Sequence, residues 1–384
     1  MPHSERFDAS AYELPEESLR TILSPALVIY RDRVRENLAR VLSRLGGDPE
    51  RWRPHVKTAK VPVIFAEFVN RGVRHFKCAT TREATLLAAT LAAEAIEAAD
   101  ILVAYPVVGP ALARLSSLAE RHPSIRFSVL CDDPAGLAEL PPALSVFVDV
   151  NPGMDRTGIP LAEGGAIRSL AARCGARFRG LHFYEGHLGD LPAAARRTRA
   201  FAGYGELLSL ARDLERAGLE IEEIVTSGTP TFTHAVDYRG FRDAGFRHRV
   251  SPGTVVYHDL RSAETLPELG LQPAALVLTR VISHPASALV TCDAGSKSIA
   301  AEAGHPVAAV LGRPGLEPRV PSEEHLPLAV VEGRPPARGE VLLLFPRHVC
   351  PTVNLAEEAL VVEERRVVDI APVSARAHDL WAGP

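Results

Sequence analysis

The strongest constraint on the fold is a regular alternation of short apolar runs with longer amphipathic stretches over the first two thirds of the chain. Eight runs have the length and composition of strands: residues 26–30, 53–56, 75–79, 101–105, 126–131, 145–150, 179–184 and 222–226. Eight strands alternating with helices predict a parallel (β/α)8 barrel over residues 25–260, with an open doubly wound sheet as the alternative. The fold class is therefore α/β.

The pattern of apolar runs and turn residues changes after residue 260. Clusters of Pro and Gly then separate further β-rich runs, at residues 274–283, 288–292, 326–332, 341–345 and 359–368. They predict a second, mostly antiparallel β domain over residues 261–384. Residues 1–24 form a polar leader that is either separate or a part of this β domain.

The composition of the chain limits the kinds of partner and the cellular compartment that we expect. A net charge of −4 gives no reason to expect a nucleic acid or an anionic membrane as a partner. No apolar run reaches the roughly 18 residues that a membrane span needs, and the polar N-terminus has no signal-peptide pattern. The five cysteines are scattered without a CxxC pair, which favours a reducing, cytoplasmic location.

Lysine is rare, and this limits any lysine-dependent chemistry. Four of the 43 basic residues are lysines, at positions 57, 60, 77 and 297. Coding bias accounts for most of this shortage, but arginine cannot replace a lysine amine that must lose its proton and attack an aldehyde. Lys57 directly follows the second predicted strand, where barrel enzymes place their active sites. A surface lysine in a loop fits equally well at this stage, and Lys60 competes.

Other strand ends also carry functional-looking residues. Arg156 lies in the loop NPGMDRTG after the sixth strand, and His182 and Tyr184 share one face of the seventh. Two loops, Ser227-Gly228-Thr229 and Ser251-Pro252-Gly253-Thr254, offer hydroxyls and backbone N–H groups that can cradle a phosphate, although most such loops are simple turns. Their clustering at one rim strengthens the prediction of a site.

His348 and Cys350 have i, i+2 spacing in the second domain. On an extended segment both side chains would project to one side and could bind one divalent metal. Imidazole with thiolate favours zinc over magnesium or calcium. Two ligands do not complete a metal site, and a lone HxC pair is more often structural.

Together these segments resemble the fold-type III pyridoxal-phosphate (PLP) enzymes of the alanine racemase superfamily, and within it the D-threonine aldolase / D-serine dehydratase family. The resemblance covers residues 25–355. It rests on RPHVKT at 53–58, the loop at 149–158, residues 180–189, SGTPT at 227–231, DAGSK at 293–297 and PRHVCPTVNL at 346–355. The pairing of PHxKT with HxC-PTVN is specific.

The resemblance implies a role for each matching residue. Lys57 would hold PLP as an imine, beside His55, and Arg156 would contact the cofactor ring. Tyr184, with His182, would line the catalytic side. The phosphate would be held by residues of two loops: Ser227, Gly228, Thr229, Gly253 and Thr254. His348 and Cys350 would bind a catalytic divalent metal, zinc in preference to manganese, and a homodimer is implied.

The implied activity is a lyase that cleaves a small-molecule D-3-hydroxy amino acid to glycine and an aldehyde. The alternatives are a D-serine-type dehydratase that gives a 2-oxo acid and ammonia, a metal-free amino-acid racemase, and a non-catalytic PLP carrier. The sequence departs from the family pattern at Ala59, where relatives have His, and at Ser251, where many have Arg. Cys350 favours the dehydratase, whereas the following Pro-Thr-Val-Asn resembles the aldolases.

Overall fold

The structure is a computed structural model that describes residues 7–381 of the chain. The first six residues of the predicted leader therefore lie outside the described residues. The chain divides into two compact units. The barrel unit contains Leu42–Lys57, Phe68–Gly253 and the residues from Ala377 onward; the β unit contains the residues up to Val41, Thr58–Glu67 and Thr254–Arg376.

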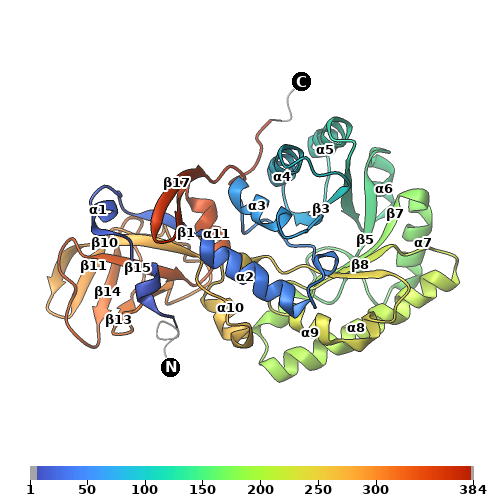
Figure 1. The fold of residues 1–384 in the computed structure, drawn as a ribbon. Coiled ribbons are helices and arrows are strands. Elements are labelled where there is room, and N and C mark those ends of the chain that lie inside the picture. Colours follow the sequence, from blue (N-terminus) through green and yellow to red (C-terminus); the bar gives the residue numbers. More distant parts are fainter. Residues whose placement is uncertain (1–6, 382–384) are drawn as a thin grey trace. The chain divides into compact units, whose positions relative to one another are not determined.

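The barrel unit is built on one sheet of parallel strands in the order β2-β3-β4-β5-β7-β8-β9 (Figure 1). A short β6 pairs with β5 only. The strand bounds are β2 His75–Cys78, β3 Ala99–Pro106, β4 Ile125–Cys131, β5 Ser145–Asn151, β6 Ile159–Pro160, β7 Phe178–Phe183, β8 Glu223–Thr226 and β9 Arg247–Val250.

The segment around residues 52–56 closes this sheet. Trp52 pairs in parallel with Val250 of β9, and His55 pairs in parallel with Lys77 of β2. The N–H of Lys77 donates to the carbonyl of Pro54 at 2.9 Å. The segment thus joins the first and last strands, and the eight parallel segments confirm the barrel over the open sheet.

Two strand assignments made from the sequence need correction. The run Ala26–Tyr30 (β1) does not belong to the barrel, because it pairs antiparallel with β10 and parallel with β16 in the β unit. The eighth barrel segment is instead β9, whose sequence RHRV has little apolar character. Local pattern identifies β1 as a strand but gives no information on partners that lie more than 240 residues away.

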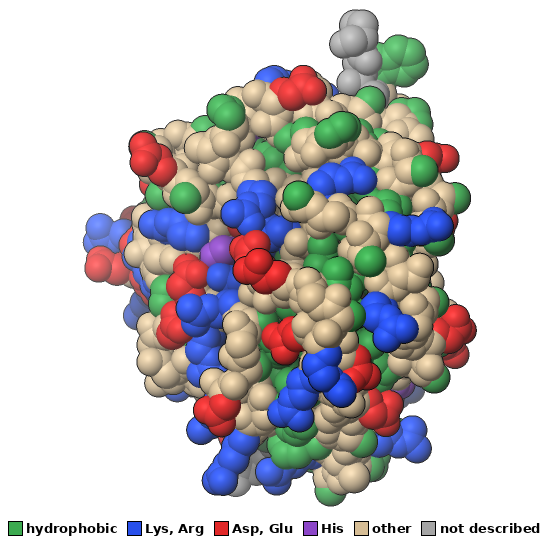
Figure 2. All heavy atoms as spheres, turned by 90° about the vertical axis from the view of Figure 1, so that its right-hand side faces the viewer, with side chains coloured by type: hydrophobic (Ala, Val, Ile, Leu, Met, Phe, Trp, Pro, Cys, Tyr) green, Lys and Arg blue, Asp and Glu red, His purple; other side chains and the backbone are tan. Residues whose placement is uncertain are grey.

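Helices α4 to α8 lie outside the barrel strands (Figure 1). The helix bounds in this unit are α4 Thr81–Ala93, α5 Pro110–Arg121, α6 Pro134–Glu139, α7 Gly164–Cys174, α8 Ala193–Arg216 and α9 Phe232–Asp237. Side-chain caps begin two of them: Thr80 accepts from the N–H of Glu83, and Asp133 accepts from the N–H of Ala135. On the face drawn in Figure 2, basic and acidic side chains are interspersed.

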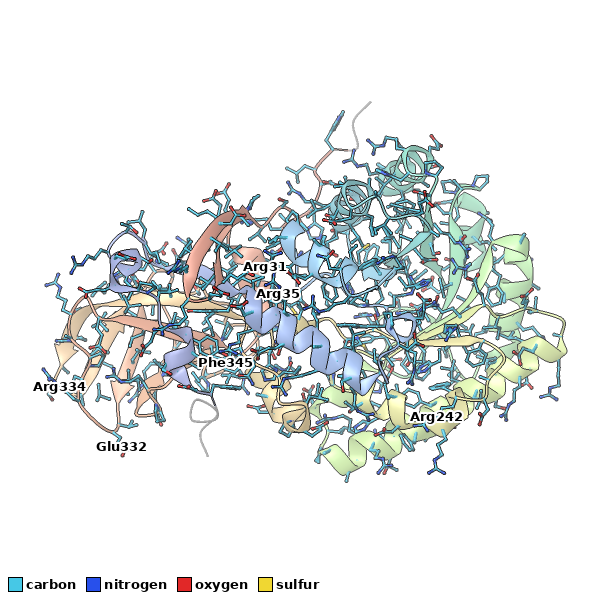
Figure 3. All side chains as sticks on the ribbon, in the orientation of Figure 1. Arg31, Arg35, Arg242, Glu332, Arg334 and Phe345 are labelled. Carbon is cyan, nitrogen blue, oxygen red and sulfur yellow. The ribbon has the colours of Figure 1, made fainter. Side chains whose placement is uncertain are left out.

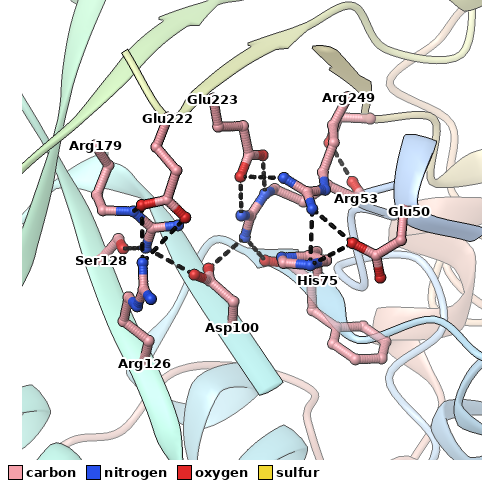
Figure 4. A network of polar contacts seen from close by, with 12 residues as sticks. Glu50, Arg53, His75, Asp100, Arg126, Ser128, Arg179, Glu222, Glu223 and Arg249 are labelled. Carbon is pink, nitrogen blue, oxygen red and sulfur yellow. Dashed lines mark hydrogen bonds and ion pairs between the residues drawn. The ribbon is translucent and has the colours of Figure 1, made fainter. Parts of the chain in front are cut away.

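Buried ion pairs fill the end of the barrel where the strands begin (Figure 4). Arg53 forms a two-bond pair with Glu223, both bonds at 2.7 Å, and a third bond of 2.7 Å with Asp100. Arg179 also binds Asp100, and Arg249 binds Glu223. Arg53 and Glu223 are fully buried. We call this end of the barrel the floor: its charges neutralise one another, and it lies opposite the end at which barrel enzymes place their active sites.

The β unit contains a nine-stranded sheet, in which only the β1–β16 pair is parallel among the described pairs. Its main path runs β13-β14-β11-β10-β1-β16-β17, and β15 joins β10 to β12. The bounds are β1 Ala26–Tyr30, β10 Ala275–Ala286, β11 Leu289–Cys292, β12 Ala308–Val310, β13 Leu316–Pro318, β14 Leu326–Val330, β15 Val341–Pro346, β16 Glu358–Glu363 and β17 Arg366–Pro372. The mostly antiparallel character predicted for the second part of the chain is thereby confirmed.

Five helices contribute to the β unit: α1 Glu16–Leu19, α2 Arg31–Arg44 as far as Val41, α3 Pro62–Val69 as far as Glu67, α10 Leu260–Thr265 and α11 Val349–Leu355. Arg31 and Arg35 lie one turn apart on α2 (Figure 3), and both donate to the buried Glu67 of α3. These ion pairs fix α3, which begins soon after Thr58. No helix within residues 7–381 is long and apolar enough to cross a membrane.

Candidate active site

Lys57 follows the barrel-closing segment, at the end of the barrel where the parallel strands finish. Its side chain is exposed, and its backbone N–H lies 3.4 Å from Nδ1 of His55. Arg156, Tyr184 and Ser227 follow β5, β7 and β8 at the same end. The structure therefore places these sequence-predicted residues on one rim of the barrel, opposite the ion-paired floor.

His182 is held by its neighbours inside the barrel. Its Nδ1 donates to the carboxylate of Asp149 at 2.7 Å, and Asp149 also accepts from the hydroxyl of Thr157 at 2.7 Å. Burial lowers the pKa of His182, although the hydrogen bond to Asp149 opposes this effect. A neutral ring with Nδ1 protonated presents a lone pair on Nε2, and Nζ of Lys77 lies 3.5 Å from that atom.

Tyr184 is fixed from three sides. The guanidinium of Arg156 lies 4.8 Å from its ring centroid. A Cβ at Gly186 would come within 2.5 Å of the ring, and one at Gly228 within 2.7 Å. Glycines are thus needed at both positions for the ring to occupy this place, which gives Gly228 a packing role that its sequence motif did not reveal.

The loop after β8 fits a phosphate group. The hydroxyl of Ser227 is buried and lacks a hydrogen-bond partner among the described residues. Within the same described part of the chain, no acceptor faces the backbone N–H groups of Gly228 and Thr229. Ser227 also has a left-handed backbone with φ of 63°, which is unusual for a serine and typical of functional loops. These donors are of the kind that phosphate oxygens require.

Gly253 ends the barrel unit in the second predicted phosphate loop. A Cβ there would overlap the carbonyl oxygen of His55. The loop is tied to the barrel-closing segment because Ser251 donates its hydroxyl to the carbonyl of Arg53 at 2.7 Å. The departure from the family pattern at Ser251 therefore has a structural consequence: the serine fixes the segment that leads to Lys57.

The metal motif lies in the β unit, and its local geometry differs from the expected extended segment. His348 is extended, but Cys350 is already in α11, which begins at Val349. The N–H of Val349 lies 3.2 Å from the carboxylate of Asp259, so a residue distant in the sequence caps this helix. The premise that the i, i+2 spacing acts on a strand was wrong.

The two side chains nevertheless face each other. Burial opposes protonation of His348, but a hydrogen bond with Cys350 and the contact with Glu302 raise its pKa to about 9. The thiol of Cys350 also lies 3.0 Å from the hydroxyl of Thr58 and 3.5 Å from that of Thr254. Thr254, predicted to bind phosphate, thus contacts the metal motif in this structure.

No group of three or more His, Cys, Asp or Glu side chains suited to a metal occurs within residues 7–381. The pair His348 and Cys350 therefore offers two protein ligands of a borderline-soft kind, and other positions would fall to water or substrate. Glu302 accepts from Nδ1 of His348. That contact would leave Nε2 of the imidazole for a metal.

The remaining lysines have other roles. Lys60 is buried and donates to the carbonyl of Ala375 at 3.1 Å, and Lys297 is exposed and paired with Glu323 and Glu324. Lys57 is thus the lysine best placed to react with a ligand at the rim. Lys77 lies in β2, and the sequence did not single it out as a site residue.

Two further residues of the rim were missed as candidates. Asp149 belongs to a recognised motif, but only the structure shows that it orients His182. His187 lies in the 3₁₀ helix Gly186–Asp190, and its buried Nδ1 has no partner among the described residues. A histidine directly after a barrel strand was the available signal, and it was outweighed by Tyr184 in the same motif.

A parallel barrel with an exposed lysine at its rim, accompanied by a mostly antiparallel β unit, defines an alanine-racemase-like protein. The family comparison agrees with this class. The chain belongs to the family described as "Alanine racemase, N-terminal domain", whose model matches residues 29–260. Residues 274–362 match a second model, "Putative serine dehydratase domain".

Known relatives span nearly the whole chain. The D-threonine aldolase of Arthrobacter sp. is 29% identical over 377 residues, which cover 94% of this chain and 95% of the relative. The solved D-threonine aldolase of Filomicrobium marinum is 27% identical, with a TM-score of 0.81 over 92% of this chain and 96% of the other. The D-threo-3-hydroxyaspartate dehydratase of Delftia sp. (strain HT23) is 27% identical over 75% and 76% of the two chains.

Proposed function

We propose that this chain is a lyase dependent on PLP and a divalent metal, which cleaves D-3-hydroxy amino acids to glycine and an aldehyde in the manner of a D-threonine aldolase. The observation that carries this proposal is the rim of the barrel. Lys57, a caged Tyr184 and the unpaired donors around Ser227 occur there in a chain whose full-length relatives are named D-threonine aldolases.

The residues of the barrel unit fit PLP. Lys57 would hold it covalently, and Ser227 with the N–H groups of Gly228 and Thr229 would bind its phosphate. Arg156 and Tyr184 supply a fixed cation and an aromatic face for its ring. When bound, PLP supplies an electron sink for a negative charge at the substrate Cα, and a divalent metal supplies a Lewis acid for the 3-hydroxyl.

Side chains of the chain itself are candidates for accepting and donating the protons of the proposed reaction. Asp149 keeps His182 in one tautomer, so that Nε2 is available as an acceptor. The buried Nδ1 of His187 offers a second ring nitrogen without a hydrogen-bond partner among the described residues. His182 lies in β7, and His187 lies in the 3₁₀ helix Gly186–Asp190 that follows it.

The metal would be held by His348 and Cys350, and the thiolate favours zinc over manganese. Solved structures of the Delftia dehydratase include variants with alanine at a histidine and at a cysteine two positions further on, and the cysteine variant is described as metal-free. The same spacing separates His348 and Cys350. Lys57 and Thr58 are consecutive residues, so the chain passes directly from the cofactor lysine to a hydroxyl that contacts Cys350.

The test is product analysis of the purified protein with PLP and zinc or manganese. D-threonine should yield glycine and acetaldehyde, and L-threonine should yield neither. Chelation should abolish turnover without removing the visible absorbance of the bound cofactor. Absence of turnover with D-threonine, D-serine and 3-hydroxy-D-aspartate under all metal conditions would refute the lyase proposal, and metal-independent racemisation would support the racemase alternative.

One observation favours dehydration as a second candidate function. Cys350 would supply a thiol ligand, and a solved structure of the Delftia dehydratase is of a cysteine-to-alanine variant described as being in the metal-free form. A dehydratase would release a 2-oxo acid and ammonia from D-serine or 3-hydroxy-D-aspartate, without glycine. The ratio of glycine to ammonia from each substrate separates the two functions directly.

We also infer a homodimer in the cytoplasm. The family resemblance supports the dimer, and the scattered, buried cysteines, none of which forms a disulfide among the described residues, support the compartment. Light scattering coupled to size-exclusion chromatography should give a mass near twice 41.4 kDa. A single-chain mass at micromolar concentration would exclude the dimer.

A further inference from the structure

Lys77 is a buried lysine that pairs with no carboxylate of residues 7–381. It lies in β2, its side chain is almost inaccessible to water, and its Nζ is 5.7 Å from the ring centroid of Tyr184. Its polar contact is Nε2 of His182 at 3.5 Å. Among the described residues no carboxylate lies within ion-pair distance of it, in contrast to the paired arginines of the barrel floor.

The charges around Lys77 come from several elements and are mostly positive. Lys57 follows the barrel-closing segment, Arg156 lies in the loop after β5, and Arg53 lies below it in the barrel. Glu185, after β7, is the opposing negative charge. Its carboxylate is also buried and is used by Tyr204 and the N–H of Ser227.

This setting disfavours a protonated amine. Burial, reinforced by the charges of Lys57 and Arg156, lowers the pKa of Lys77 to about 7. His182 is itself held neutral by burial and offers an acceptor, so a neutral Lys77 can donate to it. In the free protein the amine is therefore uncharged over much of the neutral and mildly alkaline range.

We propose that Lys77 is a charge-compensating residue of the cofactor site, and this proposal rests on the proposed function. The amine would be neutral in the free protein and would take up a proton when a phosphate-bearing pyridine cofactor binds. The physical reason is that the cofactor brings a phosphate dianion into a cluster of fixed cations. Negative charge nearby stabilises the ammonium form of Lys77, and by linkage the proton strengthens binding of the anion.

Isothermal titration calorimetry can measure the proton uptake that accompanies binding. Pyridoxine 5′-phosphate is the probe, because its alcohol cannot form an imine with Lys57. Titrations in HEPES and in Tris give the number of protons taken up on binding. With a pKa near 7 in the free protein, the wild type should take up about 0.9 proton more than Lys77→Met at pH 8, and about 0.1 more at pH 6.

Controls separate this inference from the proposed function. Lys297→Met removes an exposed lysine and should keep the wild-type proton uptake. If wild type and Lys77→Met bind the probe with equal proton uptake, the inference about Lys77 is wrong while PLP binding stands. If neither the probe nor PLP binds, both proposals fail.

A second measurement does not depend on the variant's folding. Because the chain has four lysines, protein labelled with 13C at the lysine Cε gives four resonances, which single Lys→Arg substitutions assign. The Lys77 resonance should titrate near pH 7 in the free protein and stay in its charged position to pH 9 with the probe bound. A Lys77 that remains charged to pH 9 in the free protein would overturn the proposal.

Discussion

Replacing Arg53 by methionine should strongly destabilise the chain, because Arg53 connects two buried carboxylates in the barrel floor (Figure 4). Its three bonds of 2.7 Å to Glu223 and Asp100 would be lost. Glu223 would keep Arg249, and Asp100 would keep Arg179. Methionine preserves most of the volume, so the loss is mainly electrostatic.

The size of the loss in unfolding free energy follows from the burial of the two carboxylates that pair with Arg53. Breaking a buried ion pair by removing one member costs about 3–5 kcal/mol, since the remaining charge stays out of water. The matched control is Arg126→Met, which removes an ion pair to Glu222 with both side chains half exposed. Such an exposed pair contributes under about 1 kcal/mol.

The pH dependence gives a second, sign-specific test. Burial opposes ionisation of Asp100 and Glu223, but their arginine partners outweigh it and hold the pKa of both carboxyls below the ordinary values. Their stabilising contribution is present above the unfolded-state pKa of about 4 and is lost as the pH falls through the folded-state pKa. The difference between wild type and Arg53→Met should therefore be full at pH 7, persist to about pH 4, and shrink as the pH falls below that value.

Urea unfolding followed by circular dichroism at pH 7, pH 4 and pH 3 measures these differences. The expected order at pH 7 is wild type, then Arg126→Met slightly below it, then Arg53→Met well below both. A cost for Arg53→Met that matches the Arg126→Met cost at pH 7, or that does not shrink between pH 4 and pH 3, would refute the electrostatic account of the floor.

Two other changes probe the rim and the metal motif. Gly253→Ala should weaken PLP binding at least about tenfold, because the new Cβ displaces the segment at His55, and a loss of ~1.4 kcal/mol in binding free energy is already tenfold in affinity. Absorbance titration with PLP measures the affinity. The control is Gly165→Ala, which has open space around its Cβ and should bind PLP normally. His348→Ala and Cys350→Ala should each lower zinc affinity by tenfold or more in calorimetry while the cofactor absorbance persists, and unchanged zinc affinity in both would exclude the proposed metal site.

The sequence predicts most of the barrel because the strands from β2 to β9 lie in the sheet in the same order as in the chain. The run Ala26–Tyr30 shows the limit of this reasoning. Its apolar pattern identifies a strand, but the choice of sheet depends on pairing with β10 and β16, far away in the sequence. The strand Arg247–Val250 was missed for the opposite reason, since its charged side chains become acceptable only through ion pairs that folding brings together.

The candidate site was predictable where a residue follows a strand, and less so where its role depends on a distant partner. Lys57, Arg156, Tyr184 and Ser227 all follow predicted strands. Cys350 was expected on an extended segment, because the apolar run before it reads as a continuing strand. The carboxylate of Asp259, 90 residues earlier, accepts from the N–H of Val349 at the start of α11, and no local pattern shows such a contact.

The most direct test of the central claim is to locate the cofactor bond. The protein is incubated with PLP, reduced with borohydride, digested, and analysed by peptide mass spectrometry. The account predicts a pyridoxyl group on Lys57, loss of the visible absorbance in Lys57→Ala, and retention of that absorbance in Lys60→Ala. A pyridoxyl group on Lys60, Lys77 or Lys297 in place of Lys57, or an unchanged visible band in Lys57→Ala, would contradict it.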